Sequence, residues 1–190
     1  MSTHWRTVDI AIWAGSEAQR ALRPPGSRWA HTQAVAERAS EIGGVLVIDD
    51  RPTLVAAAYL HDIGYAAELV KTGFHPLDGA LWLRAQGLER LASLVAHHSG
   101  ARFEAAARGY AECLAAFSEE QSAVADALTY CDLTTGPNGE RISVASRLHE
   151  IKVRYGPASL VAQAINAAGA TLGAAVARTE ARMYGLSQPR

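Results

Sequence analysis

The stretch LVAAAYLHDIG, residues 54–64, joins a run of apolar side chains directly to a histidine and an aspartate. An apolar helix of this kind belongs in a protein core. There an imidazole beside a carboxylate is costly unless a partner offsets the loss of hydration. A bound metal ion is the commonest such partner. We therefore interpret His61 and Asp62 as candidate metal ligands.

The composition bounds the classes of protein that this chain can form. Its 190 residues are enough for one domain, which we expect to span residues 1–190. The net charge is −1, from 18 basic and 19 acidic residues, and gives no overall attraction to nucleic acid or to an anionic membrane. The spacing of Cys113 and Cys131 is not that of a metal-binding motif. We expect both to be reduced thiols, with one disulfide between them as the alternative.

The expected location is the cytoplasm. The N-terminal residues lack the continuous apolar segment of a signal peptide. No window is expected to approach the roughly 20 apolar residues that span a bilayer. The Ala-rich stretch 169–177 is short, and Thr171 and Gly173 interrupt it.

The periodicity of apolar residues predicts an all-α protein of roughly seven to nine helices. We expect Ser27 to cap the second helix, and the capping-box pattern that begins at Ser118 to start the helix that carries Asp132. Gly and Pro residues separate the segments. The expected helices cover residues 8–22, 27–42, 52–62, 76–86, 88–98, 103–117, 118–133, 143–155 and 157–184.

Further candidate ligands lie at the ends of these helices or inside them. Metal ligands must converge in space, whatever their spacing in the sequence, and helix ends can meet at one cleft. Neighbouring helical residues point about 100° apart, so His61 can bind one metal while Asp62 reaches a second. The remaining candidates are His31, His75, His97, with His98 beside it, and Asp132.

The ordered set resembles the metal-dependent phosphohydrolases of the HD superfamily. The defining pattern of that superfamily is a His, then a His-Asp pair, then a distant Asp, here His31, His61-Asp62 and Asp132. Its binuclear members add two histidines between the pair and the last Asp. The resemblance covers residues 28–132 and is closest to small members such as the bacterial dinucleoside-polyphosphate hydrolases, which carry a basic residue before the first His.

The resemblance implies the following site. Six residues would hold divalent metal ions, two in number, with iron or manganese favoured over zinc, cobalt, nickel and magnesium: His31, His61, Asp62, His75, His97 and Asp132. Asp62 would bridge the metals, and water activated by them would attack phosphorus. Arg28 would clamp the phosphate, and His98 or a metal-bound water would protonate the leaving group. His98 is otherwise an alternate ligand. The implied reaction is hydrolysis of a phosphate ester or anhydride of a nucleotide or another small phosphorylated metabolite.

One position departs from the pattern of the superfamily. Many members read His-Asp-x-Gly-Lys, whereas Tyr65 replaces the Lys here. Lys71, in the following link, is the expected substitute, so Arg28, Tyr65 and Lys71 are the expected substrate contacts. A group of basic residues after the last Asp reads most simply as a solvated helix face, with positive charge beside the cleft as the alternative: Arg147, Lys152 and Arg154.

Two other functions remain as alternatives. Mixed-valent diiron oxygenases that act on organophosphonates use the same scaffold and ligand order, and some relatives are non-catalytic nucleotide-sensing modules. The metal-site core is expected over residues 28–135, followed by C-terminal helices over residues 143–185. The last helix is rich in small residues. It either caps the same domain or forms a homodimer contact.

Overall fold

The computed structural model describes residues 7–23 and 26–187, and these form an all-α fold, as the sequence predicts. Within those residues there are ten α-helices and four short 3₁₀ turns, with a single isolated bridge between Thr135 and Arg141. The helices are α1 (Thr7–Leu22), α2 (Ser27–Ile42), α3 (Arg51–Leu60), α4 (His75–Ala85), α5 (Glu89–His97), α6 (Ala101–Arg108), α7 (Ala111–Ala115), α8 (Ala123–Leu133), α9 (Val144–Tyr155) and α10 (Leu160–Ser187).

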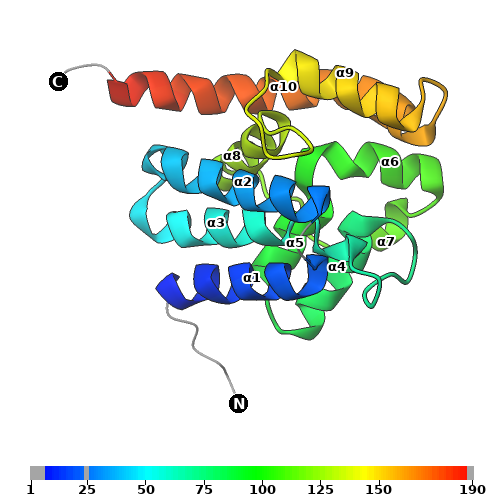
Figure 1. Cartoon of the computed structure of the whole chain (residues 1–190), viewed down its shortest axis with the longest axis horizontal. Helices are drawn as coiled ribbons and strands as arrows, with labels where there is room; N and C mark the ends of the chain where they lie inside the picture. Colours follow the sequence, from blue (N-terminus) through cyan, green and yellow to red (C-terminus); the bar gives the residue numbers. More distant parts are fainter. Residues whose placement is uncertain (1–6, 24–25, 188–190) are drawn as a thin grey trace.

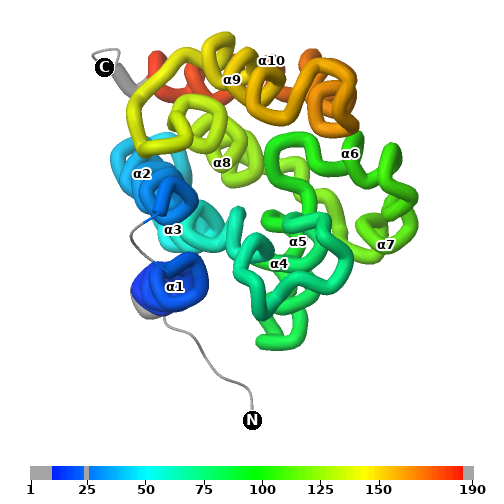
Figure 2. The backbone as a smooth tube through the Cα atoms, turned by 45° about the vertical axis from the view of Figure 1, so that its right-hand side comes forward, coloured from blue at the N-terminus to red at the C-terminus, as the bar shows by residue number. Residues whose placement is uncertain are grey.

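Helix α8 lies at the centre of the fold, in contact with α2 and α3 and also with α10 (Figure 1). Helix α3 lies between α1 and α2, and α4 pairs with α5 beside them. Helix α10 packs across α8 and α6, and α9 lies next to it (Figure 2). Buried apolar side chains from α1 through α10 belong to one hydrophobic cluster. The ends of α3, α5 and α8 are thereby held close to one another.

Helix α3 is central because it is apolar on nearly every side. Leu54, Leu60 and the three alanines 56–58 are all fully buried. A helix that is hydrophobic all round is stable only inside a protein, and its alanines let neighbouring helices approach closely. The apolar run before His61 therefore forms a core helix, and His61 is its C-cap.

Three expected helix boundaries were wrong. Gly109, with φ of +78°, ends α6, so the helix expected over residues 103–117 is two helices and the total exceeds nine. Ser122, not Ser118, caps α8, because its side chain accepts a hydrogen bond from the backbone N–H of Ala125. Gly26 occupies the N-cap position of α2, and Ser27 is the first helical residue.

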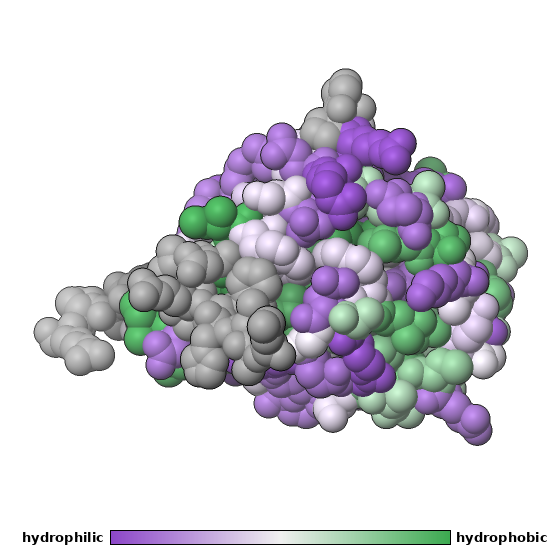
Figure 3. Space-filling view, turned by 90° about the horizontal axis from the view of Figure 1, so that it is seen from below, coloured by the Kyte–Doolittle hydropathy of each residue, from purple (hydrophilic) through white to green (hydrophobic). Residues whose placement is uncertain are grey.

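The expectation that no apolar segment reaches membrane-spanning length was also wrong. Residues 160–185 of α10 are long and apolar enough to cross a bilayer, by length and composition alone. One face of this helix packs on the protein through Ala168, Leu172 and Val176, which are buried in the core. The core helix of a water-soluble protein passes the same test, so the length of α10 does not decide its environment. Hydrophilic and hydrophobic side chains intermingle on the face seen from below, over the described atoms (Figure 3).

Candidate metal centre

The His61-Asp62 pair lies where α3 ends and the 3₁₀ turn Ile63–Tyr65 begins. Gly64 in that turn packs so closely on α4 that an added Cβ would lie 2.1 Å from the carbonyl oxygen of His75. Only glycine permits this approach. The close packing brings the first residue of α4 beside the last residues of α3, and Nε2 of His75 lies 3.3 Å from Oδ1 of Asp62.

The turn after α5 supplies His98 and Ser99. Ser99 and Gly100 both have positive φ, at +48° and +73°, so the chain reverses sharply at this point. Nε2 of His98 lies 3.3 Å from Nε2 of His75, and Oγ of Ser99 donates a 2.5 Å hydrogen bond to Oδ2 of Asp132. This turn therefore places His98 beside His75 of α4 and Ser99 beside the carboxylate of Asp132 on α8.

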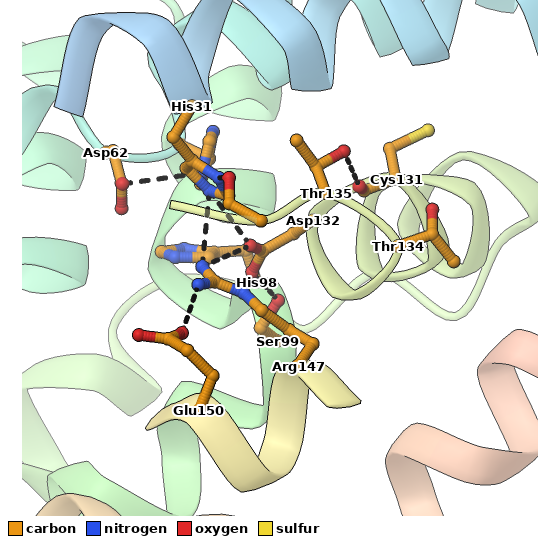
Figure 4. Close-up of polar contacts among 12 residues, drawn as sticks. His31, Asp62, His98, Ser99, Cys131, Asp132, Thr134, Thr135, Arg147 and Glu150 are labelled. Atoms are coloured by element: carbon orange, nitrogen blue, oxygen red, sulfur yellow. Dashed lines mark hydrogen bonds and ion pairs between the residues drawn. The ribbon is translucent and has the colours of Figure 1, made fainter. Parts of the chain in front are cut away.

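His31 and Asp132 approach the cluster from α2 and α8. Nε2 of His31 lies 3.2 Å from Oδ1 of Asp132, and both residues are buried. The backbone carbonyl of Gly136 is 3.0 Å from Nδ1 of His31. Gly136 belongs to the turn that follows α8, so this turn holds the ring of His31 toward Asp132 (Figure 4).

Two triads of ligand atoms share one carboxylate. In each triad the three ligand atoms all lie within 4.8 Å of one another. Asp62 belongs to both triads, which is the placement that a bridging ligand requires. The first triad is His31, His61 and Asp62, and the second is Asp62, His75 and His98.

The chemistry of the imidazoles fits a metal site. Nδ1 of His31, His61 and His98 each faces a backbone carbonyl oxygen, at 3.0, 2.7 and 2.6 Å. A carbonyl only accepts, so Nδ1 carries the proton and the Nε2 lone pairs point into the cluster. Nε2 of His61 is buried and has no hydrogen-bond partner. A bound cation would supply the partner that this atom lacks.

The protonation states also suit metal binding. Burial lowers the pKa of His61 to about 4 and brings the pKa of His75 well below its usual value. Burial alone would raise the pKa of Asp62, but charge interactions with His61 and Arg28 outweigh it and hold that pKa well below its usual range. Near neutral pH the two imidazoles are therefore neutral and the carboxyl is ionised, as metal ligands must be.

Two arginines contact the two aspartates. Nη1 of Arg28 lies 2.5 Å from Oδ2 of Asp62. Nη2 of Arg147 lies 3.5 Å from Oδ1 of Asp132, and its Nη1 lies 2.8 Å from Glu150. Arg147 and Glu150 both extend from α9 (Figure 4).

Arg147 and Arg154 correct the interpretation of their segment as a solvated face. Arg147 is only 5% exposed, and both arginines line the cavity at the cluster, whereas Lys152 is not among the lining residues.

His97 does not join the cluster, and the expectation that favoured it is corrected to His98. Nε2 of His97 donates to the carbonyl of Phe117, at 2.8 Å. Nε2 of His98, in contrast, lies 3.3 Å from Nε2 of His75, so the two adjacent imidazoles point to different parts of the protein. His97 ends α5, and His98 begins the turn toward Asp62.

Two expected substrate contacts are also placed differently. Lys71 is exposed in the link before α4 and does not line the cavity. The ring of Tyr65 lines the cavity but lies between Arg28, at 3.9 Å, and His75, at 4.0 Å. Tyr65 therefore positions these two side chains through both faces of its ring.

Sequence reasoning missed two residues that position the ligands. Ser99 orients Asp132, and its only signal was its place between a doubled His and a Gly. Asp78 is buried and accepts bonds of 2.9 and 3.1 Å from the backbone N–H groups of Thr72 and Gly73. It fixes the link that leads into His75, and its place in the first turn of a helix was the available signal.

The cluster opens into a cavity of about 270 Å³. Asp62, His75, His98 and Asp132 line this cavity, and so do Arg28 and Arg147. Comparison with known families agrees with this geometry. The family model of the HD domain matches residues 28–136, more than half of the chain, and the chain belongs to the HD domain family. A search of the curated proteins and a search of the solved structures each gave no match.

Proposed function

We propose that the chain is a metal-dependent phosphohydrolase that cleaves a phosphate ester or anhydride of a small phosphorylated metabolite, a nucleotide included, in the cytoplasm. The observation that carries the proposal is the pair of ligand triads that share Asp62 and face a cavity containing arginines. Two divalent ions, with iron or manganese favoured, would polarise phosphoryl oxygens there and lower the pKa of a nearby water.

Arg28 and Arg147 give the site its affinity for an anion. Arg28 uses one guanidinium nitrogen on Asp62, and its remaining N–H groups are able to bind phosphoryl oxygens. Arg147 lies at the other aspartate, lines the same cavity as Arg28, and is able to contact the same phosphoryl group. The two guanidinium groups thus offset charge that develops on phosphorus oxygens in the transition state.

His98 is assigned as a ligand and not as the acid that protonates the leaving group. Its Nδ1–H donates a hydrogen bond to the carbonyl of Val95, at 2.6 Å, and only Nε2 faces the other ligands. One nitrogen cannot bind a metal and deliver a proton at the same time. The expected acid role of His98 is therefore withdrawn from the proposal.

Phosphate release from a panel of phosphate esters by the metal-loaded chain tests the proposal. Asp62→Asn keeps the shape of the side chain but removes its charge, and we expect release to fall at least about 100-fold. Asp49→Asn, at an exposed aspartate, is the matched control and should leave release unchanged.

Three outcomes would contradict the proposal. Unchanged turnover in Asp62→Asn removes the site from catalysis. Dioxygen uptake with an organophosphonate and without phosphate release would favour the oxygenase reaction. Stabilisation of the chain by a nucleotide without turnover would favour a sensing module.

A further inference from the structure

We infer that α9 and α10 form an apolar subsite beside the metal centre, and that the substrate is a monoester with one phosphoryl group on an apolar organic group. The phosphoryl end of this inference rests on the proposed function. The apolar end rests on the lining of the cavity, which neither the ligand pattern nor the family match addresses.

The lining of the cavity includes two chemically different groups of residues, which we call its inner half and its outer half. The inner half carries the ligand triads and the two arginines described above. The outer half is lined by apolar side chains that follow the family match, which ends at residue 136. These are Ile151, Tyr155, Val161 and Ile165. The segment matched by the family therefore supplies the metal ligands and Arg28. The helices that follow it supply Arg147 and these four apolar side chains, which add to the apolar lining from Phe74, Pro76 and Ala101.

The charged groups of the outer half already have partners. Nε of Arg154 lies 2.7 Å from Glu150, and Nε of Arg108 lies 2.6 Å from Glu104. A second phosphoryl group would lie beside the carboxylate of Glu104, which also lines the cavity, and would compete with an existing ion pair. Like charge of this kind disfavours a polyphosphate chain. The carboxylate of Glu104 therefore favours an uncharged group over a second phosphoryl group in the outer half.

The aromatic surface offered to a ligand comes from Tyr155 and not from Tyr65. Both faces of Tyr65 are covered, by Arg28 and by His75. The two side chains are equally exposed, Tyr65 at 39% and Tyr155 at 40%, but the nearest cation over the ring of Tyr155 is Arg154 at 5.9 Å. The hydroxyl of Tyr155 lies 3.5 Å from the hydroxyl of Tyr65. Its ring continues the apolar wall that begins at Ile151 on the same helix.

The size of the cavity limits the ligand. Its volume of about 270 Å³ lies just below the range of about 300–1,000 Å³ that is usual for pockets of drug-sized ligands. A phosphoryl group with an organic group of modest size is the ligand that this volume suits. A dinucleoside polyphosphate, with two nucleosides, would extend well beyond it.

Binding of two alkylphosphonates to the Mn²⁺-loaded full chain tests the inference without requiring turnover. Isothermal titration under argon compares ethylphosphonate with hexylphosphonate, which share the anionic group and differ by four methylenes. Each fully buried methylene increases the affinity about fourfold, but the outer half of the cavity covers only part of the hexyl group. We expect hexylphosphonate to bind at least about 10-fold more tightly.

A matched pair of variants locates the effect. Ile165→Thr changes a residue that lines the cavity, and Val153→Thr changes one on α9 that is 68% exposed and does not line it. The preference for hexylphosphonate should fall at least threefold in Ile165→Thr and stay unchanged in Val153→Thr. An ethylphosphonate affinity equal to that of the unsubstituted chain shows that the inner half is intact in each variant.

Equal affinities for the two phosphonates, binding of neither, or equal effects of the two substitutions would overturn the inference. The corresponding alkyl phosphates separate this failure from failure of the proposed function. Hydrolysis of both esters at equal kcat/KM, with equal phosphonate binding, rejects the subsite and keeps the hydrolase. A hexylphosphonate preference without hydrolysis of either ester keeps the subsite and rejects the hydrolase.

Discussion

Replacing Gly64 by alanine should damage the fold and the candidate metal centre together. The added Cβ would lie 2.1 Å from the carbonyl oxygen of His75 and 2.7 Å from the backbone nitrogen of Gly79. Ordinary contacts at these atoms begin above 3 Å, so α4 must move away by about 1 Å. Both neighbours are backbone atoms, and no side-chain rotation relieves the clash. The movement carries the imidazole of His75 away from Asp62.

The expected loss of stability follows from this geometry. Overpacking of a core costs about 1–3 kcal/mol, and a clash with two backbone atoms of α4 belongs at the upper end, about 3 kcal/mol. For a chain of this length each kcal/mol changes Tm by about 2–4 °C, so Tm should fall by about 6–12 °C. Gly169→Ala in α10 is the matched control, because nothing lies within 4 Å of its added Cβ. It should be neutral or stabilise by up to about 1 kcal/mol.

Thermal unfolding followed by circular dichroism measures the loss of stability, and elemental analysis of the purified variant measures bound metal. We expect Gly64→Ala to bind less metal per chain than Gly169→Ala under the same conditions. A Tm and a metal content equal to those of the unsubstituted chain would refute the argument that close packing of the turn on α4 places His75.

Three further predictions concern the phosphate clamp, the docking of α10 and the thiols. Arg28→Lys should lower kcat/KM for phosphate release about 10- to 100-fold, since a lost charge-assisted hydrogen bond costs about 1.5–3 kcal/mol; full activity of the variant would reject the clamp. The pKa of Asp126 is lowered, since hydrogen bonds from its two arginine partners on α10 outweigh its burial. Asp126→Asn should therefore lower the free energy of unfolding by about 1 kcal/mol at pH 6, and this difference from the unsubstituted chain should vanish as pH falls below about 4. Glu180→Gln, at an exposed glutamate, should leave the free energy of unfolding unchanged at both pH values. A difference for Asp126→Asn that is independent of pH would reject the pairing. A thiol reagent should label the exposed Cys113 in the native chain and reach the buried Cys131, whose pKa burial raises, only in denaturant; two labelled thiols in the native state would contradict the packing of α8.

Much of the fold could be predicted because it depends on local patterns. The apolar run before His61 could only be a buried helix, and the all-α class and the family follow from residues that the sequence shows. The errors lie where one residue changes the path of the chain. Gly109 adopts positive φ and divides a helix, and Ser122 caps α8 although a stronger capping pattern begins at Ser118.

The candidate site could be predicted in type but not in every residue. The order of histidines and aspartates indicates a metal site, but the choice between His97 and His98 depends on how the chain leaves α5. That exit requires positive φ at Ser99, which no periodicity reveals. Arg147 lies outside the ligand pattern, and only the packing of α9 against α8 and α10 places it beside Asp132.

The most direct test of the account is the metal content of His98→Ala and His97→Ala, measured side by side by elemental mass spectrometry after reconstitution with Mn²⁺. The account predicts about two equivalents in the unsubstituted chain and in His97→Ala, and about one equivalent or less in His98→Ala. Loss of metal in His97→Ala with full content in His98→Ala would contradict the ligand assignment, and no bound metal in any of the three chains would contradict the metal centre itself.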